Sequence, residues 1–329
     1  MRTDLPRKTA YLALCVALLV VAAGAGVSVG THTIAPAEVW RAFVDHTGSD
    51  DHMIIREIRV PRTVLGICVG AALGASGTLI QTLTRNPLAE PGLLGVTAGA
   101  GFAITVGGAL HLAGTQSAQL ALAFTGAVLA ALVVYAVGRS SPLRLVLAGV
   151  ALSFVLAGVS LGMRLMLPDV LDRFRFWSVG SLAGREQSSL ALPLSLIVLA
   201  LIGAMAVTRP LNALVLGEQV AQVLGGHVVR TRAAVLVLVT LLAGVATTVA
   251  GPIAFVGLMV PHLARRAAAG SVPWLMAYTM LLGPILLLVS DIGARVLLPT
   301  GEVPVAVVTA FLGGPVLIWV VRRYGTVTL

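Results

Sequence analysis

Long runs of apolar residues, separated by short polar segments, dominate the chain. Ten such windows can be placed, and most of them reach the roughly 17–25 residues that a helix needs to cross a bilayer. The windows lie at about 9–29, 63–84, 92–110, 118–138, 145–166, 189–207, 233–250, 252–268, 272–294 and 306–321. The pattern therefore predicts an all-α polytopic membrane protein, with ten transmembrane helices in a single domain that covers 1–329.

The longest uncharged stretch, 233–264, is expected to hold parts of two of these helices. As one helix it would measure about 48 Å, whereas the hydrocarbon core of a bilayer is roughly 30 Å thick. Gly251 and Pro252 interrupt it, and a proline breaks a helix because it has no N–H to donate. We therefore expect one span on each side of this dipeptide, and an even total places both termini on the same side.

The positions of the basic residues indicate which side this is. With the termini inside, the inner segments hold 13 of the 22 Lys and Arg residues and three of the 13 acidic residues. Short cytoplasmic loops of membrane proteins carry an excess of Lys and Arg. We therefore expect cytoplasmic termini, a cytoplasmic loop at about 209–232, and outer loops at about 30–60 and 167–188.

The composition excludes a water-soluble protein. The chain is 58% hydrophobic and 11% charged, whereas soluble domains carry about 25% charged residues. Its mean hydropathy is +1.00. In a soluble protein the net charge of +9 would indicate nucleic acid, but here it follows from the inner loops, and we expect no nucleic-acid partner.

The sequence also argues against catalysis by this chain. Its only lysine is Lys8, so it has no phosphate-binding Gly-Lys-Ser/Thr loop, and any ATP hydrolysis must belong to another chain. No HExxH, CxxC or DDxxD motif occurs. The polar residues within the spans are almost all neutral, whereas ion-coupled carriers usually keep an ionisable group there. This favours a passive, gated pathway, with a secondary transporter and a non-transporting receptor scaffold as alternatives.

Arginines recur every three residues in REIRVPR, just before the second span, as Arg56, Arg59 and Arg62. If the stretch is helical they share one face, although Pro61 makes its continuity uncertain. They can contact lipid phosphate or nearby acids, or they can form a docking surface for an acidic partner. Arg295 could extend that surface, and Asp291, one helical turn before it, offers a local salt bridge instead.

The longest inner loop contains an apolar pattern with helical spacing. In NALVLGEQVAQVLGGHVVR (212–230) the apolar positions run from Leu214 to Leu224, and Gly225 and Gly226 mark the end of the pattern. The polar face carries Glu218 and no basic residue. Since helices that lie on lipid usually carry Lys or Arg there, this favours a groove on a partner protein over the lipid surface.

Two prolines and an arginine mark a turn in QTLTRNPLAEPGLLG (81–95). Pro87 and Pro91 end helices, and Arg85 lies at an inner boundary. The preceding span carries Gly66, Gly70 and Gly74 at four-residue spacing, which predicts close contact with another helix.

Taken together, these stretches resemble the FecCD/BtuC-type permeases of ATP-binding-cassette importers for iron-siderophores, haem and vitamin B12. RVPRTVLGICVGAALGASGTLIQTLTRNPLAEPGLLGVTAGAG (59–101) resembles the family's most characteristic region. The resemblance continues through 145–152, 176–184, LNALVLGEQVAQVLGG (211–226), AGPIAFVGLMVPHLARRAAAG (250–270) and 297–321. It covers nearly the whole chain, and it is specific for the family but not for the cargo.

The resemblance implies a BtuC-like (type II ABC importer) fold in the bacterial cytoplasmic (inner) membrane. It implies a second permease subunit, either identical or a paired homologue, two cytoplasmic ABC ATPases, and an extracytoplasmic substrate-binding protein. ATP and Mg would be held by the ATPases, and this chain would bind no cofactor. ATP closure of the ATPases would then drive alternating access of the permease pathway.

The resemblance also implies roles for particular residues. Arg56, Arg59, Arg62 and Arg295 would meet glutamates of the binding protein. The coupling helix in the ATPase cleft would contain Leu216, Gly217, Glu218, Ala221, Leu224 and Gly225. Gln81 would face the pathway or its inner mouth, while Ser140 and Ser141 would occupy the inner gate loop.

The cargo is not specified by the sequence. A ferric siderophore is expected because it is the family's commonest cargo. Haem usually has His or Tyr ligands, which the spans lack apart from Tyr135 and Tyr278. Haem and vitamin B12 remain the alternatives.

Overall fold

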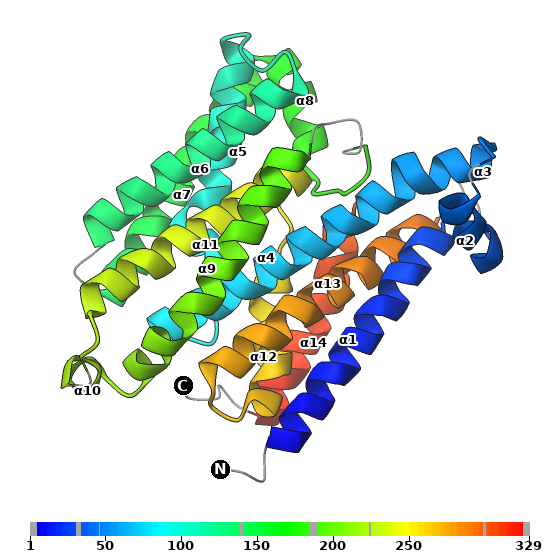
Figure 1. The fold of residues 1–329 in the computed structure, drawn as a ribbon. Helices are drawn as coiled ribbons and strands as arrows, with labels where there is room; N and C mark the ends of the chain where they lie inside the picture. The colour runs from blue at the N-terminus through cyan, green and yellow to red at the C-terminus, as the bar shows by residue number, and fades with distance from the viewer. Residues whose placement is uncertain are drawn as a thin grey trace.

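The computed structural model describes residues 5–30, 34–45, 47–138, 141–184, 190–223, 225–298 and 301–324. Within these ranges every regular element is a helix. Long helices run through the body of the molecule, and short ones lie at its two ends (Figure 1). The all-α prediction is therefore confirmed for the part of the chain that the structure describes.

Each of the ten apolar windows contains one helix. These helices are α1 (Leu5–Ser28), α4 (Val60–Thr84), α5 (Val96–Ala109), α6 (Gln116–Gly138), α7 (Pro142–Met166), α9 (Ala191–Val215), α11 (Val228–Ala250), α12 (Val256–Ala268), α13 (Val272–Val296) and α14 (Val305–Tyr324). By length and apolar composition, seven stretches in the described residues can cross a membrane: α1, α4 with the residues before it from Asp50, α6, α7 from Leu143, α9, α11 and α13. The apolar parts of α5 and α14 are shorter, and α12 has 13 residues. The structure thus supports seven spans, and the count of ten stays a prediction.

The long uncharged stretch is divided where the sequence predicted. Helix α11 ends at Ala250, and α12 begins at Val256. Between them Gly251 has a φ of 76°, and Phe255 adopts the left-handed conformation with a φ of 69°. The two helices are therefore separated by irregular backbone.

Helix α4 lies at the centre of the bundle and packs against α9, α11, α12 and α13 (Figure 1). Gly70 on α4 faces Gly283 and Pro284 on α13 so closely that a Cβ atom at Gly70 would lie 2.6 Å from the Cα of Pro284. No real Cβ contact is that short, so only glycine permits this approach. The glycine spacing in α4 thus produces the backbone contact that the sequence predicted.

The short helices identify the two ends of the molecule. At one end lie α2 (Pro36–Val44), α3 (Asp50–Met53) and α8 (Pro168–Ser178), from the two loops predicted to be outer (Figure 1). At the opposite end of the molecule lie α10 (Glu218–Val223), the start of α1 and the end of α14. This arrangement agrees with an even number of crossings. We call these the α2 end and the α10 end.

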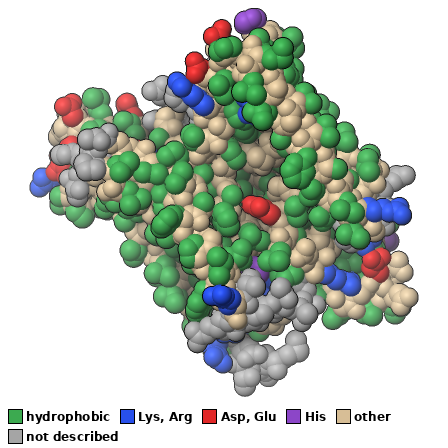
Figure 2. Space-filling view, turned by 180° about the vertical axis from the view of Figure 1, so that it is seen from behind, with side chains coloured by type: hydrophobic (Ala, Val, Ile, Leu, Met, Phe, Trp, Pro, Cys, Tyr) green, Lys and Arg blue, Asp and Glu red, His purple; other side chains and the backbone are tan. Residues whose placement is uncertain are grey.

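Hydrophobic side chains cover much of the outer surface of the long helices. Figure 2 shows a face covered largely by hydrophobic side chains, with most of the charged ones toward the edges of the view. Large apolar side chains on the long helices are exposed, among them Phe154, Leu199 and Ile202. Such an extended apolar surface requires lipid or a partner subunit to cover it.

Candidate functional site

The predicted arginine cluster lies at the α2 end, where a π-helical segment, η1 (Ile54–Arg59), continues into α4. Pro61 sits in the first turn of α4, where its missing N–H costs no helical hydrogen bond. The backbone is therefore continuous. The three arginines nevertheless lie in different surroundings, since Arg56 is exposed whereas Arg59 and Arg62 are buried. The prediction of one shared face assumed α-helical spacing, whereas the π turn before α4 is wider, which accounts for the different burial of Arg56.

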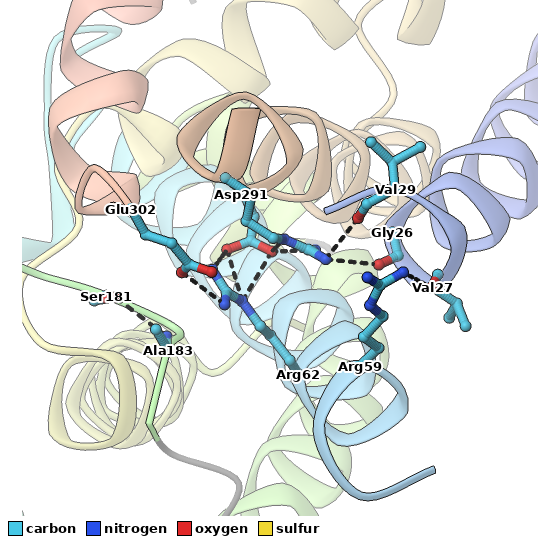
Figure 3. A network of polar contacts seen from close by, with 10 residues as sticks. Gly26, Val27, Val29, Arg59, Arg62, Ser181, Ala183, Asp291 and Glu302 are labelled. Atoms are coloured by element: carbon cyan, nitrogen blue, oxygen red, sulfur yellow. Dashed lines mark hydrogen bonds and ion pairs between the residues drawn. The ribbon is translucent and has the colours of Figure 1, made fainter. Parts of the chain in front are cut away.

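Arg62 is the centre of a buried ion cluster that joins α4 to α13 (Figure 3). Its Nε lies 3.1 and 3.2 Å from the two carboxylate oxygens of Asp291, and its Nη2 lies 2.8 Å from Oδ1. Its Nη1 lies 2.8 Å from Glu302, in the segment between α13 and α14. Arg295 donates to the other face of the same Asp291, with an Nη2–Oδ2 distance of 2.5 Å. Two arginines thus share two carboxylates, and Asp291 is fully buried.

Arg295 of this cluster and the neighbouring Arg59 cap the end of α1. Arg295 Nη1 lies 2.8 Å from the carbonyl oxygen of Gly26, and Arg59 Nη1 lies 2.9 Å from that of Val27 (Figure 3). Arg59 Nη1 also lies 2.7 Å from the carbonyl oxygen of Ser28. The last carbonyls of a helix lack intrahelical partners and carry a partial negative charge. The cluster therefore fixes the C-terminal end of α1 as well as α4 and α13.

These contacts show which of the four arginines have partners within the chain, but they do not test the prediction that the four contact a binding protein. Arg59, Arg62 and Arg295 already have partners within the chain, whereas Arg56 presents an exposed side chain at the same end. The local Arg295–Asp291 bridge is confirmed, but the sequence did not indicate that Arg62 joins it. Docking stays a prediction, and Arg56 is the member of the set best placed for it.

At the α10 end, the proline-containing turn is tied to the neighbouring helix. Arg85 ends α4 in the left-handed conformation, and its Nη2 lies 2.6 Å from the carbonyl oxygen of Leu214 near the end of α9. The side chain of Asn86 accepts from the backbone N–H of Leu88. The segment from Pro91 to Leu94 forms the short 3-10 helix η2, which leads into α5. The turn and the end of α9 are therefore joined directly.

Gln81 on α4 is held by α12. Pro261 within α12 lacks the N–H that would bond to the carbonyl of Gly257, four residues earlier. The Nε2 of Gln81 lies 3.4 Å from that oxygen and 3.2 Å from the carbonyl oxygen of Leu258. Arg265 in turn donates to Oε1 of Gln81 at 2.8 Å. Gln81 is fully buried, and its position on the pathway stays a prediction.

Arg265 was not singled out from the sequence. Its Nε and Nη1 are buried and have no hydrogen-bond partner among the described residues. Since buried polar groups are usually paired, this is an unusual feature. It places unsatisfied donors beside Gln81, where the sequence indicated only neutral polar residues.

Glu90 contacts the other end of α12. Its carboxylate accepts a hydrogen bond from the backbone N–H of Phe255, the residue that precedes the helix. Burial raises the pKa of the Glu90 carboxyl, and this hydrogen bond opposes the rise but does not cancel it. The turn after α4 is thus anchored both to α9, through Arg85, and to α12, through Glu90.

The predicted coupling segment is divided between two helices. Leu214 is buried near the end of α9, which continues to Val215, and α10 starts at Glu218 after Gly217 with a φ of 117°. The expectation of one apolar helical face from Leu214 onward is therefore wrong. Ala221 is buried, but Val223 is 87% exposed. The described part of the segment thus turns apolar side chains outward: Leu216, Val220 and Val223.

Glu218 forms an ion pair with Arg232 in the second turn of α11. This pair joins the first residue of α10 to a long helix that packs on α4. Gly225, with a φ of 80°, lies in the connection to α11. Leu224 falls outside the described residues.

The predicted gate loop is described only in part. Ser141 caps α7, and its hydroxyl accepts from the backbone N–H of Arg144 at 3.3 Å. Ser140 lies outside the described residues. In the described part of the chain, no group of three or more His, Cys, Asp or Glu side chains is arranged to hold a metal ion.

The bundle, its apolar surface and its spanning helices define a multi-pass membrane protein, and comparison with known proteins defines its family. The model of the FecCD transport family matches residues 16–323, and the chain belongs to this family of ABC transporter permeases. It is 46% identical over 311 residues to the ferric enterobactin transport system permease protein FepD of Escherichia coli, covering 93% of each chain.

Other relatives and one solved structure agree with this assignment. The chain is 36% identical to a siderophore transport system permease protein, YfiZ of Bacillus subtilis, over 96% of each chain. It is also 36% identical to the hemin transport system permease protein HmuU of Yersinia pestis, over 93% of each. An inward-facing structure of a metal-chelate type ABC transporter superposes with a TM-score of 0.85 at 26% identity, covering 96% of this chain and 99% of that one.

Proposed function

We propose that this chain is the permease subunit of an ABC importer that carries a ferric siderophore into the bacterial cytoplasm. The observation that carries the proposal is the 46% identity to the ferric enterobactin permease over 93% of both chains. The 36% identity to the hemin permease makes haem the second candidate cargo. Vitamin B12 is a third candidate, which rests on the family resemblance alone.

The proposed assembly has two permease subunits, two cytoplasmic ATPases that hold ATP and Mg, and an external binding protein. We assign ten spans to each permease and place the α10 end, with both termini, in the cytoplasm. The excess of Lys and Arg in the segments at that end supports the orientation, because positive loops are retained inside.

Coupling in this proposal passes through α10. An ATPase would receive the exposed side chains of Leu216, Val220 and Val223. Movement of the ATPase would be transmitted to α11 through the Glu218–Arg232 pair. The same movement would be transmitted to the end of α4 through the Arg85–Leu214 hydrogen bond. The first contact joins α10 to a helix that packs on the central α4, and the second joins α9 to the end of α4 itself. One displacement of α10 can therefore move several helices and open the pathway to one side of the membrane at a time.

Docking of the binding protein is assigned to the α2 end. Arg56 is exposed there and is suited to a carboxylate of the partner, since a guanidinium forms bidentate pairs with carboxylates. Arg59, Arg62 and Arg295 would act mainly by holding the backbone that carries Arg56. This keeps the four predicted arginines in one functional region, with different tasks.

The test is the ATPase activity of this chain reconstituted with its genomically adjacent ATPase and binding protein. The binding protein is supplied empty or loaded with ferric catecholates, ferric hydroxamates, haem or cobalamin. Stimulation by a loaded ferric siderophore, lost in Arg56→Glu, is the expected result. Stimulation only by the binding protein loaded with haem or cobalamin would change the assigned cargo to that compound. ATPase activity that does not respond to any loaded binding protein would contradict the proposal that the chain is an importer permease.

A secondary transporter is the alternative mechanism. Uptake by such a protein would proceed without the ATPase and would stop when an ionophore removes the ion gradient. Uptake by the proposed importer should require ATP inside the vesicle and should continue with the ionophore present. The same vesicles therefore decide between the two mechanisms.

A further inference from the structure

A continuous groove runs along α11 from the α10 end toward the middle of the bundle. Three hollows meet there. Tyr135, Leu145 and Leu236 line both the hollow farthest from α10 and the middle hollow next to it. Leu83, Thr84 and Arg232 line both the middle hollow and the one nearest α10. Each hollow thus shares wall residues with the next one, and we treat the three together as one groove along α11.

The inner part of the groove is apolar and faces outward between long helices. Its hollow has a volume of about 210 Å³, and its walls are formed mainly by α6 and α11. Leu132 and Val237 on these walls are more than half exposed, at 56% and 57%. Both helices are among the seven stretches able to cross a membrane by length and composition, and we therefore infer that this opening faces the hydrocarbon region.

The mouth of the groove is basic. Arg232 lines the two hollows nearest the α10 end, and Arg85 lines the outermost one. Glu218 is the acidic residue in the lining of that outermost hollow, and it pairs with Arg232. The Arg232 side chain remains 28% exposed, so a second anion can reach it.

The length of the groove matches one leaflet of a bilayer. The lining residues of α11 run from Val229 to Leu241, which is about 18 Å of helix. Half of a bilayer's hydrocarbon core is about 15 Å. The apolar hollow accounts for Ala233 to Leu241, about 12 Å of this length, and the arginine lies at its mouth. Such a groove can hold most of one acyl chain with an anionic headgroup at the basic end.

We propose that this groove, between α6 and α11, binds an anionic phospholipid of the cytoplasmic leaflet. The acyl chain lies against Tyr135, Leu236 and Val237, and the phosphate contacts Arg232. Glu218 and the phosphate compete for this guanidinium, so the lipid acts on the first residue of the proposed coupling helix. The binding site takes from the proposed function only the orientation of the chain, and its effect on coupling also rests on the proposed role of α10. The binding test needs no cargo and no ATPase.

The test is native mass spectrometry of the purified full chain, titrated with phosphatidylglycerol or phosphatidylethanolamine. Arg232→Gln should lower the affinity for phosphatidylglycerol about fivefold, the effect of one basic residue near an anionic lipid. Arg230→Gln is the matched control, because Arg230 is exposed on the same helix but does not line the groove. It should change the affinity less than twofold.

Two further variants probe the depth of the groove and the competition. Val237→Trp fills the apolar hollow and should abolish the tightest adduct, whereas Ile202→Trp, exposed on α9, should not. Glu218→Gln should raise the affinity for phosphatidylglycerol severalfold and leave that for phosphatidylethanolamine unchanged. Glycerol 3-phosphate, which has the phosphate but no acyl chain, should not displace the lipid.

Four outcomes would overturn the inference. Equal affinities for the two lipids, both of which carry a phosphate, would remove the preference for a net anionic headgroup, and an unchanged affinity in Arg232→Gln would remove the role of Arg232. Displacement by glycerol 3-phosphate would make the site one for free phosphate. A dimer in the same spectra that is lost in Val237→Trp, with lipid adducts unchanged, would show that a second copy of the chain occupies the groove.

Discussion

Arg62 and Asp291, which are 229 residues apart in the sequence, form a bidentate ion pair in the interior of the α2 end. Asp291 also binds Arg295, so one carboxylate balances two buried guanidinium groups. Removal of one partner from such a cluster leaves a buried charge without compensation, which costs far more than the pair contributes in net terms.

Asp291→Asn should therefore lower the free energy of unfolding by about 3–5 kcal/mol. The measurement is equilibrium unfolding in mixed micelles. Asp172→Asn is the control, because Asp172 forms an exposed pair with Arg175 on α8, and such pairs contribute roughly 0–1 kcal/mol. Equal stability of the two variants would mean that the cluster is hydrated in solution.

Gly70→Ala should force α4 and α13 apart. The added Cβ would lie 2.6 Å from backbone atoms of Pro284, which cannot rotate away, and overpacking of this kind costs roughly 1–3 kcal/mol. Gly158→Ala on α7 is the control, because no atom lies within 4 Å of the position of its Cβ. There alanine should be neutral or stabilising, as it is in other helix interiors. Thermal unfolding followed by circular dichroism measures both, and an unchanged midpoint for Gly70→Ala would contradict the close approach.

Val223→Asp should uncouple the permease from its ATPase without unfolding it. The side chain is 87% exposed at the α10 end, so a charge there costs the isolated chain little but would have to be buried in the proposed cleft. We expect co-purification with the ATPase and ATP-driven uptake to fall about tenfold, as for a residue central to an interface. Leu5→Asp, exposed at the same end, should leave both intact. Full uptake by Val223→Asp would place the ATPase elsewhere.

The two neighbouring arginines, Arg56 and Arg59, should respond differently to charge reversal. Arg56→Glu should remove stimulation by the loaded binding protein and keep the thermal stability, because Arg56 is exposed. Arg59→Glu should unfold at a lower temperature, since it loses the hydrogen bonds to the end of α1 and places a carboxylate beside backbone carbonyls. Arg175→Glu, exposed on α8, is the matched control for Arg56. Stimulation retained in Arg56→Glu would exclude Arg56 from docking.

The stability of the native chain relative to Glu90→Gln should depend on pH. Burial raises the pKa of Glu90 in the folded state, so its contribution to stability is fully present below the unfolded value of about 4.3 and is lost as the pH rises through the folded value. Glutamine does not titrate and still offers an acceptor to Phe255. The difference in melting temperature, variant minus native, should become more positive from pH 5 to pH 8. A difference that is constant with pH would mean that Glu90 is hydrated.

The sequence predicted the helices well because their signals are local. Apolar runs, the break at Gly251 and Pro252, and the glycine spacing in α4 each depend on residues within a few turns of one another. The Arg295–Asp291 bridge, which the sequence offered as the alternative to docking, could be recognised for the same reason, since its members are one turn apart.

What the sequence did not predict depends on tertiary contacts or on the register of the backbone. Arg62 and Asp291 meet only because α4 packs on α13, and no local pattern pairs them. The π-helical η1 changed the direction of Arg56 relative to Arg59, although the spacing favoured a shared face. Leu214 continues the spacing of α10 but belongs to α9, because the helix ends at Val215 rather than before it.

Pro261 and Gln81 lie on different helices, but they should not mutate independently. The proline leaves the carbonyl of Gly257 without its helical donor, and the glutamine supplies a donor from α4. Pro261→Ala would restore the N–H that bonds to the carbonyl of Gly257 within α12, so this carbonyl would no longer need the donor from Gln81. Removal of the Gln81 side-chain amide should therefore cost less stability in the Pro261→Ala background than in the native chain. The pair therefore defines an epistatic link. A homologue without a proline here should lose the glutamine at a smaller cost than one that keeps the proline, although the bonds of Gln81 to Leu258 and Arg265 are lost in both.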